Sequence, residues 1–163
     1  MQRIDFIFND KRFRYIINTI NEREKDRIFC RHGFEHTLEV ARLSYIFALE
    51  NGAMEKDKRL TKDVIYATAL LHDIGRFSEL EQEMDHRQAG PILAEPILRD
   101  AGYTEEEIEL INDAILRHGD KNSDPVSLAG ILYKADKLSR ECFLCEAYDI
   151  CNWPEEKKNH SLI

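Results

Sequence analysis

The feature that most constrains the fold is a series of amphipathic segments separated by Gly, Asn, Asp and Pro. Apolar residues recur within these segments at the three- and four-residue spacing of a helix, and few stretches alternate strictly as strands do. The pattern therefore predicts an all-α protein. A chain of 163 residues can bury one substantial core but not two, so we expect a single-domain helical bundle spanning residues 1–163.

Capping and breaking residues predict where the helices begin and end. We expect a helix from near Asp10 to about Lys25, and another from near Gly33 to Gly52, where a glycine suits the left-handed residue after a helix. A later helix should close at Gly102 for the same reason.

Three further boundaries follow from turn chemistry. Thr104, with Glu107 three residues later, predicts a capping box at the start of a helix that ends at His118. Residues 78–85 are polar and predict a loop. Asp124 and Pro125 predict the N-cap and first residue of the helix that carries ILYKAD.

The segment VIYATALLHD, residues 64–73, is apolar on almost every side and predicts the central buried helix, with Thr61 as its N-cap. It ends in His72 and Asp73, and a second aspartate, Asp136, follows the apolar run ILYKA. Burying an aspartate costs free energy unless it is paired or binds a metal. These two carboxylates are the first indication of a metal site.

Histidines near helix ends also indicate a metal site. Four of the six histidines lie there: His36, His72, His86 and His118. Any one of them alone is more often a structural residue than a ligand. A histidine, a His-Asp pair at the end of an apolar helix and a late aspartate, all in one helical domain, are hard to explain by packing alone.

Three segments carry this combination: HGFEHTLEVARLSYIFA contains His36, ATALLHDIGR contains His72 and Asp73, and LYKADKLSR contains Asp136. Together they resemble the motifs of the HD-domain metal-dependent phosphohydrolases, over a core of about residues 31–148. The resemblance implies that these four side chains bind a divalent ion in a helical bundle. Mixed imidazole and carboxylate ligands favour Mn, Fe, Co, Ni or Zn over Mg or Ca.

The same resemblance implies hydrolysis of a phosphate ester or anhydride, since a bound metal can lower the pKa of water from about 15.7 to about 7. Asp73 is then suited to orient or deprotonate the attacking water. Arg76 is a second catalytic candidate, because a guanidinium can bind a phosphoryl oxygen with two hydrogen bonds. Its alternative is a surface ion pair with Glu79 or Asp73. Lys137 and Arg140 are weaker candidates for phosphate contacts, or residues of a solvated helix face.

His86 and His118 raise the question of a second metal. Histidines at similar places hold a second ion in the binuclear branch of the family, which includes cyclic-dinucleotide phosphodiesterases. Here Arg117 precedes His118 where those enzymes carry two adjacent histidines, and their Gly-Tyr-Pro signature is absent. We therefore favour one ion over two, with His86 and His118 as phosphate contacts or proton donors and a second metal site as the alternative.

The four cysteines form another candidate cluster. Cys142, Cys145 and Cys151 are closely spaced, and Cys30 can lie near them in a small bundle. They could hold a structural zinc ion or an iron–sulfur cluster. Their spacing is not a standard one, and free cysteines often serve as small buried apolar residues, which is the interpretation that we favour from sequence.

Charge and length limit the partners. A net charge of −8 and a pI near 5.3 argue against duplex nucleic acid, whereas a small phosphorylated substrate is compatible because a bound cation dominates the local field. No signal peptide and no apolar run of about 18 residues is evident. We expect a cytoplasmic location, no membrane association and reduced cysteines.

The sequence thus favours a phosphohydrolase acting on a small nucleotide-type metabolite. One alternative is a cyclic-nucleotide or cyclic-dinucleotide phosphodiesterase with a binuclear site. Another is a non-catalytic HD module that senses a ligand, but the presence of all four expected ligands favours an enzyme. The sequence does not choose between phosphomonoesterase, phosphodiesterase and pyrophosphohydrolase, and it predicts no oligomeric state.

Overall fold

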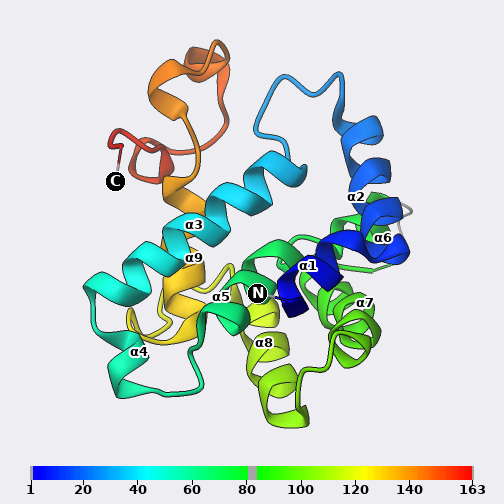
Figure 1. Cartoon of the computed structure of the whole chain (residues 1–163). Coiled ribbons are helices and arrows are strands. Elements are labelled where there is room, and N and C mark those ends of the chain that lie inside the picture. Colours follow the sequence, from blue (N-terminus) through cyan, green and yellow to red (C-terminus); the bar gives the residue numbers. More distant parts are fainter. Residues whose placement is uncertain (1, 81–83, 163) are drawn as a thin grey trace.

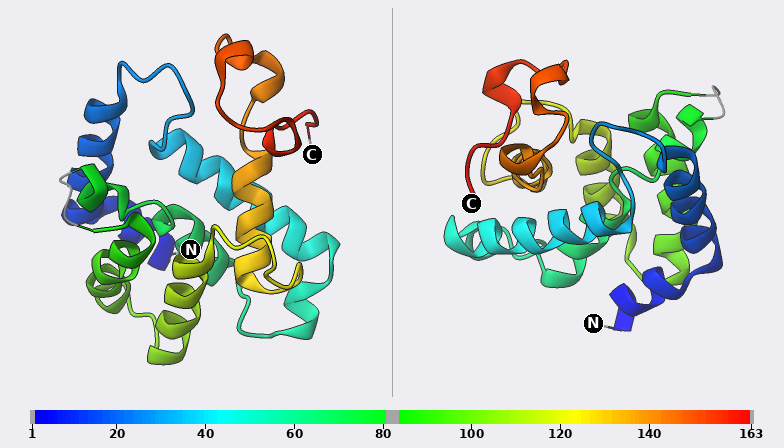
Figure 2. Two further views of the ribbon diagram at one scale, coloured as in Figure 1. Left: turned by 180° about the vertical axis from the view of Figure 1, so that it is seen from behind. Right: turned by 90° about the horizontal axis from the view of Figure 1, so that it is seen from above.

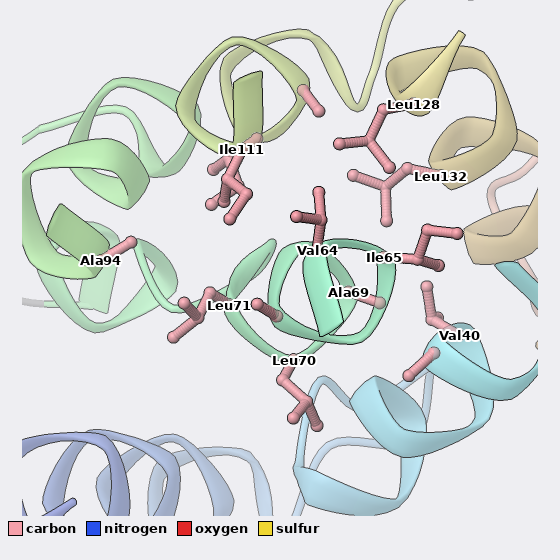
Figure 3. Close-up of a cluster of buried hydrophobic side chains, with 14 of the residues drawn as sticks. Val40, Val64, Ile65, Ala69, Leu70, Leu71, Ala94, Ile111, Leu128 and Leu132 are labelled. Atoms are coloured by element: carbon pink, nitrogen blue, oxygen red, sulfur yellow. The ribbon is translucent and has the colours of Figure 1, made fainter. Parts of the chain in front are cut away.

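Helix α5 (Lys62–Leu71) lies at the centre of the computed structural model, which describes residues 2–80 and 84–162. Its apolar side chains point in several directions, as Figure 3 shows: Val64, Ile65, Ala69, Leu70 and Leu71 meet side chains of the surrounding helices. A helix that is apolar all round can be stable only if it is enclosed by others. This confirms the central buried helix that the sequence predicts.

The other helices lie around α5 in Figure 1. They are α1 (Gln2–Asn9), α2 (Lys11–Glu24), α3 (Phe34–Glu50), α4 (Ala53–Lys56), α6 (Arg76–Leu80), α7 (His86–Asp100), α8 (Glu105–Arg117) and α9 (Leu128–Leu138). Helix α3 packs against α5 and α9, and α7 packs against α8. The described residues contain no strand, which confirms the all-α class.

Several predicted helix boundaries are confirmed by capping geometry. The Thr104 hydroxyl accepts a hydrogen bond from the backbone N–H of Glu107, whose carboxylate accepts one from the N–H of Thr104. Asp10 caps α2 through the N–H groups of Arg12 and Phe13. Gly52 and Gly102 have φ values of 67° and 81°, the left-handed conformation expected just after a helix.

The predicted start of α9 at Asp124 and Pro125 is wrong. Asp124 accepts a hydrogen bond from the N–H of Val126 with its side chain and one from Ser127 with its carbonyl, which forms a turn. The N-cap is Ser127, whose hydroxyl accepts from the N–H of Gly130. Local side-chain bonds to the backbone therefore delay the helix by three residues.

Two other expectations need correction. The loop predicted at residues 78–85 begins later, because α6 extends to Leu80; residues 81–83 lie outside the described part of the chain. The stretch before Asp10 forms helix α1, which the sequence analysis did not assign. Ile7 of α1 is fully buried, and Arg3 forms ion pairs with Asp63 and Glu107.

The C-terminal segment differs from the bundle. It contains three short 3₁₀ helices, η1 (Cys142–Leu144), η2 (Tyr148–Ile150) and η3 (Glu155–Lys157). Figure 2 shows this segment, in orange and red, at one end of the molecule in both views. Among the described helices, none is long and apolar enough to cross a membrane.

Candidate metal centre

The predicted metal ligands come from the ends of different helices. His36 lies in the first turn of α3, His72 is the C-cap of α5 with Asp73 directly after it, and Asp136 lies in the last turn of α9. His118 is the C-cap of α8. Helix ends carry side chains beyond the packed helix faces, which lets these residues meet where the helices converge.

The four predicted ligands do converge. His36, His72 and Asp73 offer three ligand atoms that all lie within 4.8 Å of one another. Asp136 Oδ1 lies 3.3 Å from His36 Nε2 and 3.9 Å from His72 Nε2. The side chains of His72 and Asp73 are almost completely buried, at 0% and 3% exposure. The structure thus brings together two imidazoles and two carboxylates in a buried site.

Hydrogen bonds of the rings leave the same nitrogen facing this site. His72 Nδ1 lies 2.7 Å from the carbonyl of Ala69, and His118 Nδ1 lies 2.6 Å from that of Ile115. A carbonyl accepts only, so each Nδ1 donates its proton there and each Nε2 is the nitrogen that faces the site. Both carbonyls belong to the last turn of a helix, where backbone acceptors lack helical partners.

The surroundings of His72 Nε2 fit a metal ion. This nitrogen is buried and has no hydrogen-bond partner among the described residues, although Asp73 Oδ2 lies 3.3 Å away. A buried polar atom without a partner costs about 1–3 kcal/mol. Two imidazoles and two carboxylates form a donor set that suits a divalent transition metal.

Asp73 also belongs to a second group. Asp73, His86 and His118 offer ligand atoms that all lie within 4.8 Å of one another. The two oxygens of Asp73 face different histidines: Oδ2 lies 3.7 Å from His36 Nε2, and Oδ1 lies 3.8 Å from His118 Nε2. Asp73 therefore stands between two triads of candidate ligands. The preference for one ion over two stays an untested prediction.

The charges of the site shift the pKa values of its buried groups. Burial would lower the pKa of His72, but Asp73 and Asp136 outweigh it and the pKa is raised. Burial would raise the pKa of Asp73, but His72 and hydrogen bonding to His36 outweigh it, and the pKa lies well below its usual value. Burial likewise opposes ionisation of Asp136, yet His36 and Arg140 hold its pKa well below the usual range. Burial and the nearby His72 lower the pKa of His118 to about 4. Ionised carboxylates and neutral imidazoles are the ligating forms.

Arg76 lies beside the site and is part of its ion-pair network. Its Nε donates to Asp73 Oδ1 at 3.0 Å and its Nη1 to Glu79 Oε2 at 3.3 Å. Both ion pairs of the alternative interpretation, with Asp73 and with Glu79, are therefore present. Since the side chain keeps 21% of its surface exposed, these ion pairs leave room for a contact with substrate.

Arg140 and Lys137 both bind Asp136. Arg140 Nη2 donates to Asp136 Oδ1 at 3.2 Å and to His36 Nε2 at 2.9 Å, and Lys137 Nζ lies 2.5 Å from Asp136 Oδ2. Arg140 is only 7% exposed, so it does not belong to a solvated helix face. Its four-residue spacing from Asp136 on one helix end is typical of an ion pair. The predicted phosphate contacts of both residues are not tested.

One positioning residue was missed by the sequence analysis. The hydroxyl of Ser139 donates to the carbonyl of Asp136 at 2.8 Å and accepts from His36 Nδ1 at 3.2 Å. This bond orients the ring so that Nε2 faces Asp136. A serine after a helix is common, so no sequence signal distinguishes Ser139 from other serines.

The four cysteines lie on one side of this centre. Cys30, Cys142, Cys145 and Cys151 line one cavity of about 520 Å³, which also reaches His36 and Arg140. All four are free thiols. The expected proximity of Cys30 to the other three cysteines is confirmed. Whether they bind a metal stays a prediction.

Comparisons with known proteins agree with the site. Residues 33–141 match the model of the HD domain. The chain is 40% identical over 162 residues to an uncharacterized protein of Clostridium beijerinckii, covering 99% of both chains. It is 34% identical over 113 residues to ribonuclease Y of Oceanobacillus iheyensis, covering 68% of this chain but 18% of that protein. No solved structure matches this chain.

The matched region contains every one of the four predicted ligands and most of the helical bundle. The chain belongs to the HD-domain family. Members of this family are typically metal-dependent hydrolases, and this chain has the histidines and aspartates that such chemistry needs.

Proposed function

We propose that this protein is a metal-dependent phosphohydrolase that cleaves a phosphate ester or anhydride in a small, nucleotide-type metabolite. The observation that carries the proposal is the buried convergence of His36, His72, Asp73 and Asp136, in which His72 Nε2 has no hydrogen-bond partner among the described residues. A site built only for stability would pair that nitrogen.

The residues of the site have separable roles in this proposal. Divalent ions, when bound, supply a water nucleophile of lowered pKa and neutralise phosphoryl charge. Asp73 would orient the attacking water through one of its carboxylate oxygens. Arg76 uses its Nε and Nη1 for Asp73 and Glu79, so its Nη2 can donate to a phosphoryl oxygen. Arg76 thus links the water-orienting carboxylate to the group under attack.

The substrate class is supported by the chemistry of the site and by the relatives. Similarity over the HD region to a protein named as a ribonuclease favours a phosphodiester or another nucleotide-type substrate. The net charge of −8 disfavours a long nucleic acid and favours a small molecule drawn in by the bound cations. A cytoplasmic location remains part of the same proposal.

The two triads that share Asp73 favour a second ion as a specific alternative to the single ion. His86 and His118 would then hold the second ion together with Asp73, whose two oxygens face different histidines. Metal analysis of protein reconstituted with Mn²⁺ distinguishes the two arrangements. About two ions per chain, falling to one in His118→Ala, indicates a binuclear site; one ion in both proteins indicates that His118 is not a ligand.

A substrate screen tests the proposed activity. Metal-reconstituted protein would be assayed with nucleoside monophosphates, nucleoside triphosphates, cyclic nucleotides and cyclic dinucleotides. We expect hydrolysis of at least one class and its loss in Asp73→Ala. His160→Ala, which removes a half-exposed histidine outside the site, is the matched control and should keep full activity. Activity that survives in Asp73→Ala would reject the site, and inactivity against all four classes would reject the proposed substrate class.

A further inference from the structure

Four cysteines from separate segments face one cavity. Cys30 belongs to the connection between α2 and α3, whereas Cys142, Cys145 and Cys151 belong to the C-terminal segment; all four line the cavity of about 520 Å³. In Figure 1 the two segments lie at the same end of the molecule, beyond the start of α3 and the end of α9. These are all the cysteines of the chain. If the cysteines served only as small buried apolar residues, they could lie anywhere in the core and would not need to line one cavity.

The thiols are near enough to affect one another. Burial raises the pKa of the Cys30 thiol, Arg140 opposes this, and Cys142, Cys145 and Cys151 raise the pKa further, so each acts on Cys30 electrostatically. No three of these sulfurs lie within 4.8 Å of one another. A tetrahedral zinc ion with Zn–S bonds of about 2.3 Å would place its sulfurs about 3.8 Å apart. The four sulfurs do not have this arrangement, and four thiols that line one cavity of about 520 Å³ fit a centre with several metal ions better.

The C-terminal segment lacks an apolar anchor of its own. Within residues 141–162, only Cys142, Ala147 and Asn159 are buried, and none of the described residues of this segment belongs to the hydrophobic core. Leu144 and Ile150 are 76% and 65% exposed. Small regions that bury little apolar surface are commonly held by disulfides or metals. The four cysteines are free thiols that line one cavity, and such a set can hold a metal centre that cross-links the two segments.

The cavity also provides positive charge. Its lining has four cations and three carboxylates, an excess of one positive charge: Arg31, Arg42, Arg140 and Lys158 against Glu35, Glu39 and Glu141. A cluster held by four thiolates carries net negative charge, and nearby cations stabilise it. Asn159 fixes the end of the segment, since its Nδ2 donates to the carbonyls of Leu138 and Arg140.

We propose that Cys30, Cys142, Cys145 and Cys151 bind a [4Fe–4S] cluster, each thiolate on a different iron. This cluster site is distinct from the centre formed by His36, His72, Asp73 and Asp136, and it does not depend on the proposed hydrolase activity. It joins the connection between α2 and α3 to the C-terminal segment. Arg140 then lies between the two centres, since it donates to the carbonyl of Arg31 as well as to Asp136.

The test is chemical analysis of the full chain purified without oxygen. Iron, zinc and acid-labile sulfide would be counted, and visible absorbance recorded before and after reduction. We expect about four sulfides per chain and a broad visible absorbance that fades on reduction. Sulfide is the decisive quantity, because iron bound by the histidines and aspartates brings none.

Three variants separate the two centres. Cys145→Ser should lose the sulfide and the visible absorbance. Leu144→Ser, a change at the neighbouring exposed residue, should keep both. His72→Ala should keep the sulfide while losing the hydrolase metal, so failure of one proposal is distinguishable from failure of the other.

Several results would overturn the cluster. They are wild-type protein with stoichiometric zinc and no sulfide, wild-type protein without sulfide after anaerobic reconstitution with iron and sulfide, and Cys145→Ser protein with the full sulfide content. The two wild-type measurements decide the matter even if a variant fails to fold.

Discussion

At the scale of single residues, a buried pair next to the metal centre makes stability depend on pH. His32 Nδ1 and the backbone N–H of His32 both donate to the carboxylate of Glu24, each at 2.7 Å. Burial lowers the pKa of His32 from 6.5 to about 4, against the opposing effect of Glu24. Burial would raise the pKa of Glu24, but the bond to His32 outweighs it and the pKa is lowered.

The sign of the pH effect follows from these shifts. Between pH 6.5 and about 4, the unfolded chain binds a proton at His32 that the folded protein does not, so unfolding becomes easier as the pH falls. Glu24 adds a further loss below its ordinary pKa of 4.5. We expect the free energy of unfolding, measured with urea at pH 7.5 and 5.5, to decrease with acidification. His32→Gln keeps a donor for Glu24 but not the titration, so its decrease should be smaller; an equal decrease would contradict the assignment.

A second prediction at this scale concerns Arg76. If Arg76 binds a phosphoryl oxygen, Arg76→Ala loses a charged hydrogen bond of about 1.5–3 kcal/mol, and kcat/KM should fall roughly 10- to 100-fold. Arg76→Lys keeps the charge but not the planar fork and should fall nearly as far.

Metal content and a control variant show whether a loss of activity in the Arg76 variants comes from the missing phosphate contact. Metal content should stay unchanged in both Arg76 variants. Arg99→Ala, which removes an exposed arginine paired with Glu95, is the control and should keep wild-type kinetics. Full activity in Arg76→Ala would leave this residue as an ion-pair partner only.

The sequence predicts which residues lie in the metal site better than it predicts what each of them contacts. His72 and Asp73 stand out because polar groups at the end of an apolar helix need a special reason to be there. The roles of Ser139 and Glu24 could not be predicted, because Ser139 meets His36, which is 103 positions away in the sequence, and Glu24 meets His32 through a turn that no motif marks. The same holds for Arg140, whose burial depends on the segment that covers it.

At the scale of elements, the turn after α5 is fixed by close packing against α7. A Cβ atom at Gly75 would lie 1.9 Å from the carbonyl oxygen of His86 and 2.6 Å from the backbone nitrogen of Gly90. Backbone atoms cannot move aside as a side-chain end can. This contact holds the Asp73–Arg76 turn against the helix that carries His86, so Gly75 positions both triads.

Gly75→Ala should therefore force the turn and α7 apart. We expect a loss of about 1–3 kcal/mol in unfolding free energy, measured by urea denaturation, with weaker metal binding. Gly119→Ala is the matched control, since its Cβ would meet only the Arg87 side chain at 3.7 Å. A Gly75→Ala protein as stable as the control would show that the turn is not closely packed.

Helix α1 shows why some elements escape prediction. Its one buried apolar residue is Ile7, and it is tied to the bundle by Arg3, whose guanidinium donates to Asp63 in α5 and Glu107 in α8. These partners are 60 and 104 residues away, beyond any local pattern. By contrast, α5 and the capping box of α8 depend on local apolar periodicity and local hydrogen bonds, and both were predicted. Asp124 failed as a predicted N-cap because its side chain forms a competing local turn.

Arg3→Ala tests the attachment of α1. The variant loses three partly buried charged hydrogen bonds, and we expect a loss of about 1–2 kcal/mol in unfolding free energy. Amide hydrogen exchange should accelerate in α1 more than in α5. Arg42→Ala, which removes an exposed arginine paired with Glu39 within α3, is the control; equal exchange of α1 in both proteins would contradict the attachment.

At the scale of the whole molecule, the bundle buries two carboxylates and their cationic partners at its centre. Asp73 and Asp136 are buried and ionised, with Arg76, Arg140 and Lys137 as their cationic partners. Helices α3, α5, α8 and α9 all contribute an end to this region, so the centre links most of the bundle. A divalent ion that binds the folded site but not the unfolded chain must therefore stabilise the entire fold.

Metal removal should lower the melting temperature of the whole protein. Binding at 100 times the dissociation constant contributes about 2.7 kcal/mol, which corresponds to several degrees for a chain of this size. We expect a chelator to lower Tm and Mn²⁺ to restore it in the wild type. His160→Ala should respond in the same way, whereas His72→Ala should show no Mn²⁺-dependent change. Because the proposed iron–sulfur cluster also adds stability, the comparison is made between proteins with equal sulfide content. If neither chelator nor Mn²⁺ changed the wild-type Tm, the buried carboxylates would form ion pairs with their arginine and lysine partners and would bind no metal.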